Sequence, residues 1–145
     1  MSDTSPLEVV LGFVRTVEAG GGAADIRPFL AEDFTLTEWP HVLSKTGSTR
    51  TLQETLAGAD DSKAIVADQR FEVVRTTAEA NRVVLEMNWS AVLLMDLPYW
   101  DAGETIRARS TAVFELKDGL ISSQDTYDCY YTLPDEPSGA AASAS

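Results

Sequence analysis

The chain has one cysteine and one histidine among its 145 residues, and these two scarcities exclude several classes of site. Cys129 has no second thiol with which to form an intramolecular disulfide, so nothing points to an oxidising compartment. Because His41 is the single imidazole, zinc and iron sites built from several His or Cys ligands are excluded. At most a carboxylate-only metal site remains, and we predict neither a metal ion nor a cofactor.

Positive charge is also scarce, with 11 Lys and Arg against 23 Asp and Glu, for a net charge of −12. This balance repels phosphate backbones and anionic lipids, so we expect no nucleic-acid partner and no membrane partner. No apolar run approaches the roughly 20 residues that span a bilayer. The opening stretch MSDTSPLEVV lacks the basic segment of a signal peptide. We therefore predict a cytoplasmic protein.

The first half of the chain carries helix signals. Ser5 and Glu8 form a capping box, and the apolar residues that follow recur at helical spacing until a run of three glycines. Asp25 is predicted to cap a short helix over residues 26–33. A second capping box at residues 51–54 opens a further helix.

From about Gln69 the apolar period changes from 3.6 to 2, which predicts a run of antiparallel strands. Asp118–Gly119 is a strong hairpin signal between the last two of them. Helices followed by such strands indicate one α+β domain over residues 1–133, and the small, polar segment 134–145 is predicted to be a disordered tail. The strand near residues 83–94 is apolar on both faces, which favours a homodimer through the open face of the sheet.

This order of elements, with the closing stretch FELKDGLISSQDTYDCY, resembles the nuclear transport factor 2-like superfamily. Its members include ketosteroid isomerases, limonene epoxide hydrolases and SnoaL-type polyketide cyclases. The resemblance implies a cone-shaped, strongly curved and mostly antiparallel sheet wrapped around about three N-terminal helices, with a mostly apolar pocket. It does not fix a reaction, because one fold serves many functions.

Comparison with two enzyme types of the superfamily narrows the function. Asp125 matches the aspartate of the epoxide hydrolases, but their partner Arg and Asp fall at Asn88 and Ser90, so this is the less favoured alternative. Glu38 falls near the general base of the ketosteroid isomerases.

The two oxyanion donors of those isomerases fall at Phe13 and Ala112, neither of which can donate a hydrogen bond. SnoaL-type cyclases require little more than an acid–base aspartate in a fitted pocket, and this sequence meets that requirement.

We therefore predict a SnoaL-like cyclase or isomerase that performs acid–base chemistry on an apolar, polyketide-like or steroid-like molecule. The alternative is a non-catalytic dimeric protein that binds a small apolar or aromatic ligand. Asp125 is the leading catalytic candidate, provided that its strand face is concave, and Glu38 and His41 are further candidates. The candidate substrate contacts are Tyr127, Tyr131, Trp39, Asn88, Trp100, Tyr99 and Phe13.

Overall fold

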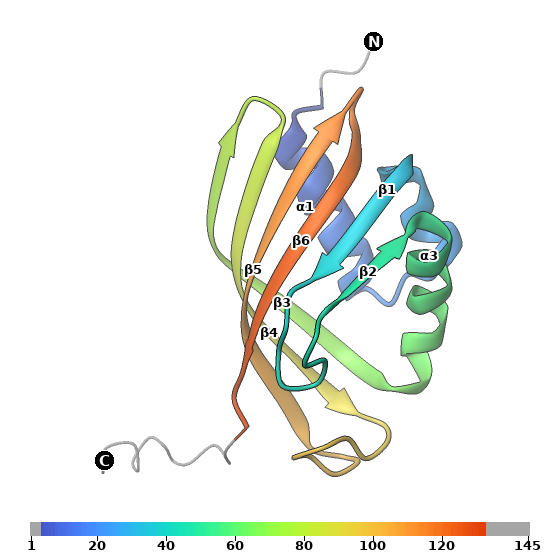
Figure 1. Cartoon of the computed structure of the whole chain (residues 1–145), viewed down its shortest axis with the longest axis vertical. Coiled ribbons are helices and arrows are strands. Elements are labelled where there is room, and N and C mark those ends of the chain that lie inside the picture. Colours follow the sequence, from blue (N-terminus) through green and yellow to red (C-terminus); the bar gives the residue numbers. More distant parts are fainter. Residues whose placement is uncertain (1–3, 133–145) are drawn as a thin grey trace.

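The computed structural model describes residues 4–132 and shows a curled sheet with helices against its concave side (Figure 1). The elements in order are α1 (Pro6–Glu18), α2 (Ala23–Ile26), β1 (Leu30–Glu38), β2 (Ser48–Thr51), α3 (Leu52–Asp61), β3 (Val66–Glu79), β4 (Arg82–Leu93), β5 (Thr105–Lys117) and β6 (Leu120–Tyr130). Short 3-10 turns cover Arg27–Phe29 and Ser62–Ala64. The predicted boundary at residue 133 and the predicted disorder of residues 134–145 lie outside the described residues.

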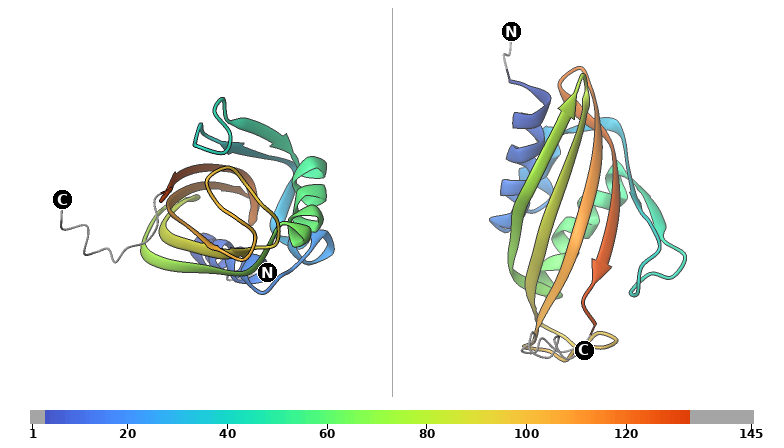
Figure 2. Two further views of the ribbon diagram at one scale, coloured as in Figure 1. Left: turned by 90° about the horizontal axis from the view of Figure 1, so that it is seen from below. Right: turned by 90° about the vertical axis from the view of Figure 1, so that its left-hand side faces the viewer.

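The strands form a sheet in the order β2-β1-β6-β5-β4-β3. Neighbouring strands are antiparallel, except that β1 and β6 run parallel. Seen end-on, the sheet curls into an incomplete roll (Figure 2). Helix α1 packs against β3 and β4, and α3 packs against β1, so we call the helix-covered side the concave face and the other side the outer face. The predicted α+β class and the curved, mostly antiparallel sheet are confirmed.

Both predicted capping boxes are present. At the start of α1, Ser5 Oγ accepts a hydrogen bond from the Glu8 amide at 3.2 Å, and Glu8 Oε1 accepts one from the Ser5 amide at 3.0 Å. Thr51 caps α3 in the same way. Within residues 4–132, no helix combines the length and the apolar character needed to cross a membrane.

The helix predicted over residues 26–33 is wrong. Helix α2 ends at Ile26, and β1 has already begun at Leu30. Leu30 pairs with Ile121 of β6 and its side chain is buried in the core, so strand pairing and burial outweigh the local helix signal. This places the polar end of β1 beside the last strand.

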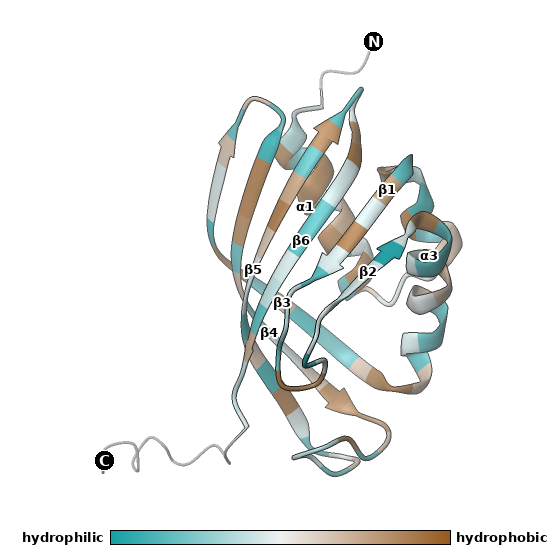
Figure 3. Ribbon diagram, in the orientation of Figure 1, coloured by the Kyte–Doolittle hydropathy of each residue, from teal (hydrophilic) through white to brown (hydrophobic). Residues whose placement is uncertain are grey.

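Buried side chains alternate with more exposed ones along most of β4 and β5, and Figure 3 shows the apolar residues of these strands in brown. Leu85 of β4 and Phe114 of β5 point to the concave face and are fully buried with α1. A second apolar cluster fills the other end of the roll, where Trp100 and Ile106 meet Tyr130. The sheet is therefore covered by helices at one end and by loop side chains at the other.

Strand β6 contains one extra residue near its start, and this bulge decides which side chains face inward. The β5–β6 ladder begins with Leu116 opposite Ile121, and its register then shifts so that Glu115 is opposite Ser123. Ser122 is the extra residue, and its Oγ donates to the Glu115 carbonyl oxygen at 3.1 Å.

Beyond the bulge, Val113 is opposite Asp125 and Ala112 is opposite Thr126. Without the extra residue, Asp125 would face Ala112, whose side chain is buried in the core. A shift of one residue exchanges the two faces of a strand. Asp128 and Tyr130 therefore lie on the concave face, and Asp125 lies on the outer face.

The assignment of faces can be tested by paired truncations on β5. Phe114→Ala should lower the free energy of unfolding by about 3–5 kcal/mol, because it empties a buried site that contacts Phe13 edge-to-face. Val113→Ala, one residue away on the outer face, should cost about 1 kcal/mol or less. Urea unfolding measures both values, and equal losses would contradict the assignment.

Candidate active site on the concave face

Polar side chains from three separate segments gather where β6 passes β5 and the end of β1. Ser110 Oγ of β5 donates to Asp128 Oδ1 of β6 at 2.7 Å. His41, just after β1, places its ring centroid 5.2 Å from that of Tyr130. His41 Nε2 lies 3.6 Å from Glu38 Oε1. These five residues, which we call the concave polar cluster, bring two carboxyl groups, an imidazole, a phenol and a hydroxyl onto one face.

Asp128 has the most perturbed carboxyl group in this cluster. Burial raises its pKa above the usual range, and the nearby Glu38 carboxylate acts in the same direction. The hydrogen bond from Ser110 and the electrostatic influence of His41 oppose this shift without cancelling it. A carboxyl group whose pKa moves toward neutrality can both accept and return a proton near physiological pH.

Tyr130 is held in the same environment. Its pKa is also raised, first by burial and then by the carboxylates of Asp128 and Glu38. The phenol therefore remains protonated near neutral pH and can act as a hydrogen-bond donor. Asp128 and Tyr130 occupy successive inward positions of one strand, so proton acceptor and hydrogen-bond donor are neighbours.

Aromatic side chains form the wall beside this cluster. Tyr130 contacts Trp89 edge-to-face, with ring centroids 6.2 Å apart, and Trp100 at 5.9 Å. Trp89 Nε1 donates to Gln69 Oε1 at 3.0 Å, which fixes the indole. Leu43, from the segment after β1, packs against the same wall. The surroundings suit a flat, apolar ring more than a strongly charged molecule.

The structure brings together some of the residues that the sequence singles out. Glu38 and His41 lie in the concave polar cluster, and Trp100 is buried beside Tyr130. Their roles in catalysis and binding remain predictions. Asp125 does not join them, because the bulge at Ser122 places it opposite Val113 on the outer face. The condition on which its catalytic role depends, a concave strand face, is therefore not met.

Three of the predicted aromatic contacts also lie away from the cluster. Trp39, Tyr127 and Tyr131 are 45%, 44% and 52% exposed. Trp39 stacks on Tyr127 with ring centroids 5.9 Å apart and an interplanar angle of 4°. The Arg107 guanidinium lies 5.2 Å from the centroid of the Tyr131 ring. This arrangement forms an aromatic strip on the outer face and not a lining of the concave face.

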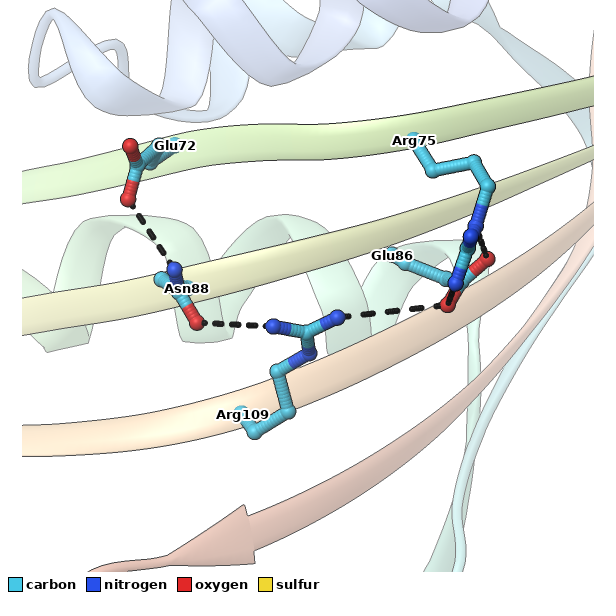
Figure 4. A network of polar contacts seen from close by, with 5 residues as sticks. All are labelled: Glu72, Arg75, Glu86, Asn88 and Arg109. Atoms are coloured by element: carbon cyan, nitrogen blue, oxygen red, sulfur yellow. Dashed lines mark hydrogen bonds and ion pairs between the residues drawn. The ribbon is translucent and has the colours of Figure 1, made fainter.

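Asn88 belongs to a polar network on the outer face of β3, β4 and β5 (Figure 4). Its Nδ2 donates to Glu72 Oε1 at 3.0 Å, and its Oδ1 accepts from Arg109 at 3.3 Å. Arg75 forms two hydrogen bonds with Glu86 in the same network. Asn88 therefore organises surface charges, away from the concave polar cluster.

The two remaining predicted contacts have different surroundings. Tyr99 is 65% exposed on the loop between β4 and β5. Phe13 is buried in the core, edge-to-face with Phe29 and Phe114. Neither is part of the concave polar cluster.

Asp128, Tyr130 and Ser110 are the site residues that sequence reasoning missed. Strict alternation along β6 places Asp128 and Tyr130 on the strand face opposite to that of Asp125, the leading candidate. The hydroxyl residues at 122 and 123, directly after the buried Ile121, are the available signal, because Ser122 bonds back to the partner strand. Ser110 sits in an otherwise apolar row of inward residues on β5, where a lone hydroxyl indicates a buried polar partner.

Comparisons with known proteins agree with this architecture. The SnoaL-like domain family matches residues 10–124, and the chain belongs to that family. No curated protein matches the sequence significantly.

Solved structures give the same fold at low identity. IdmH, a proposed polyketide cyclase from Streptomyces antibioticus, is 15% identical with a TM-score of 0.70, over 86% of this chain and 91% of that one. A proposed polyketide cyclase from Xanthomonas campestris is 20% identical with a TM-score of 0.70, over 84% and 88%. A protein with a ketosteroid isomerase-like fold from Catenulispora acidiphila is 14% identical with a TM-score of 0.67, over 83% and 84%.

The raised pKa of Asp128 predicts a specific pH dependence of stability. The folded protein holds this proton more tightly than the unfolded chain, whose Asp pKa is about 4. As pH rises through the window between the two pKa values, the unfolded chain releases the proton first and the folded state loses stability. Asp128→Asn cannot ionise, so its stability relative to wild type should increase across that window.

Urea unfolding at a series of pH values measures this difference. A stability difference between Asp128→Asn and wild type that stays constant, or that falls with pH, would contradict the raised pKa of Asp128.

Proposed function

We propose that this protein is an acid–base enzyme of the cyclase or isomerase type, with Asp128 as the group that moves the proton. The observation that carries the proposal is the position of Asp128, which is half-buried on the concave face, accepts a hydrogen bond from Ser110 and lies two residues before Tyr130 on the same face. Membership of the SnoaL-like family and the fold shared with proposed polyketide cyclases support the same class of reaction.

The chemistry follows from the surroundings of Asp128. An ionised Asp128 can take a proton from a carbon next to a carbonyl group, leaving an enolate, and can return the proton to that enolate at the same or another carbon. Trp89, Trp100 and Tyr130 provide aromatic faces against which an apolar ring, polyketide-like or steroid-like, can lie. Such a reaction consumes no cofactor, because the proton is taken and returned by one carboxyl group.

A second candidate function is a non-catalytic protein that binds the same class of ring compound. The exposed aromatic groups of Trp39, Tyr127 and Tyr131 on the outer face favour this non-catalytic function, because a ring compound bound there would lie away from Asp128. The two functions differ in one measurable respect, which is whether a proton on the bound molecule exchanges with solvent.

Proton exchange on simple ketones tests the proposal. Wild-type protein should accelerate hydrogen–deuterium exchange at the carbon next to the carbonyl of 1-tetralone or 2-tetralone, followed by NMR in heavy water. Asp128→Asn should lose roughly 10²–10⁴-fold of this rate, the usual contribution of general acid–base catalysis.

Asp125→Asn is the matched control, since it makes the same change three residues away on the outer face, and it should keep the wild-type rate. Loss of exchange in Asp125→Asn with full activity in Asp128→Asn would overturn the assignment. Binding of both ketones without exchange by wild type would favour the non-catalytic alternative.

We also propose that the protein forms a homodimer through the outer face. Each copy carries a net charge of −12, so two copies repel each other over most of their surfaces. The outer face of β3–β5 is an exception, because five of the 11 Lys and Arg residues lie there, where Glu72, Glu86 and Glu115 oppose them. The five are Arg70, Arg75, Arg82, Arg107 and Arg109.

The aromatic strip of Trp39, Tyr127 and Tyr131 continues this surface of mixed charge with exposed apolar area. Because a two-fold interface uses the same patch twice, a negative charge at Tyr127 would repel its counterpart. Tyr127→Glu should convert a dimer to a monomer in analytical ultracentrifugation, whereas Tyr99→Glu, an exposed tyrosine on the β4–β5 loop, should stay dimeric. A monomeric wild type would contradict the proposal.

A further inference from the structure

Two buried polar atoms on the concave face have no hydrogen-bond partner among the described residues, and both lie beside Glu38. They are His41 Nε2 and Ser48 Oγ. The His41 side chain is only 6% exposed. A third such atom, Thr55 Oγ1, belongs to α3. Buried polar groups are normally satisfied, so two unpaired polar atoms near one carboxylate mark a position where a polar atom from outside the chain would complete the hydrogen bonding.

The positions of both orphans are fixed by the fold. Ser48 of β2 is directly opposite Glu38 in the β1–β2 ladder, so their side chains lie on the same face of the sheet. That face is the concave one, because Glu38 is also paired with Thr126 of β6, which is opposite the buried Ala112. We call Glu38, His41 and Ser48 the Glu38 corner.

The hydrogen-bonding capacity of His41 is also fixed. The Leu43 amide donates to His41 Nδ1 at 3.1 Å, so Nδ1 carries the lone pair and Nε2 carries the hydrogen. Nε2 lies 3.6 Å from Glu38 Oε1, which is beyond hydrogen-bond distance. The Glu38 corner therefore presents an N–H donor from His41 and a carboxylate acceptor from Glu38. The Ser48 hydroxyl can act as a hydrogen-bond donor or as an acceptor.

We infer that the Glu38 corner binds a hydroxyl oxygen of the ligand, as in a phenol or an enol. A hydroxyl donates one hydrogen bond and accepts two, which matches Glu38 as acceptor and His41 and Ser48 as donors. A carbonyl or ether oxygen can only accept hydrogen bonds. It would meet the Glu38 carboxylate, which is also an acceptor, with no hydrogen between the two oxygens. A carboxylate or phosphate would be repelled by Glu38 and Asp128.

This inference rests on the proposed function in one respect, which is that the ligand ring lies on the concave face beside Tyr130. His41 joins the two parts of the site, because its ring contacts Tyr130 while its Nε2 belongs to the Glu38 corner. The ligand class thereby narrows to ring compounds that carry a hydroxyl, and the hydroxyl fixes the orientation of the ring relative to Asp128.

Three naphthalenes of nearly equal shape test the donor and acceptor pattern. 2-Naphthol donates and accepts, 2-methoxynaphthalene only accepts, and naphthalene does neither. In equilibrium binding to the full chain, 2-naphthol should bind roughly tenfold or more tightly than the other two, as expected for the hydrogen bonds it adds. Because His41 is the only histidine, the Nε2–H signal in NMR reports directly on the corner, and 2-naphthol should shift it more strongly than the other two compounds.

Single substitutions assign the contacts. Glu38→Gln and Ser48→Ala should each remove most of the preference for 2-naphthol, while Ser123→Ala, a serine on the outer face of β6, should leave it intact. The contribution of His41 is read from its NMR signal in the wild-type protein.

The outcomes separate this inference from the proposed function. Equal binding of the three compounds with an unmoved His41 signal would mean that water alone fills the corner, and would overturn the inference even if ketone exchange by Asp128 is observed. A preference for 2-naphthol with a shifted His41 signal would support it even if no exchange is found.

Discussion

The bulge at Ser122 is the local feature on which the arrangement of the site depends. One extra residue in β6 exchanges the faces of every later residue in the strand, so Asp128 and Tyr130 lie on the concave face and Asp125 and Tyr127 lie on the outer face. The bulge is held by a hydrogen bond from Ser122 to the partner strand. The candidate site on the concave face therefore contains Asp128 because of a backbone irregularity near the start of the same strand.

The bulge at Ser122 has electrostatic consequences for the residues that follow it. Burial raises the pKa of Asp128, and its neighbours modify that shift in opposite directions, Glu38 upward and Ser110 and His41 downward. Across the sheet, the outer face receives the aromatic strip and the network of Arg75, Glu86, Asn88 and Arg109. Strand β6 thus separates a face that carries a carboxyl group of raised pKa from a face that carries exposed aromatic and charged side chains.

Much of the fold could be predicted from the sequence, because its signals are local. The capping boxes at Ser5 and Thr51 and the Asp118–Gly119 turn act within a few residues, and the structure contains all three. The short helix expected after Asp25 failed because pairing between Leu30 and Ile121 is a long-range interaction that the local pattern does not reveal. For the site, Glu38 and His41 could be found as polar residues at a strand break. Asp128 could not, because alternation places Asp125 inward unless the bulge is known.

The most direct test of this account is a crystal structure of the protein soaked with 2-naphthol. The account predicts the naphthalene ring on the concave face beside Tyr130, with its hydroxyl at the Glu38 corner and Asp128 next to the ring. A ring bound on the outer face, against Tyr127 and Asp125, with the concave face occupied only by protein side chains and water, would contradict it.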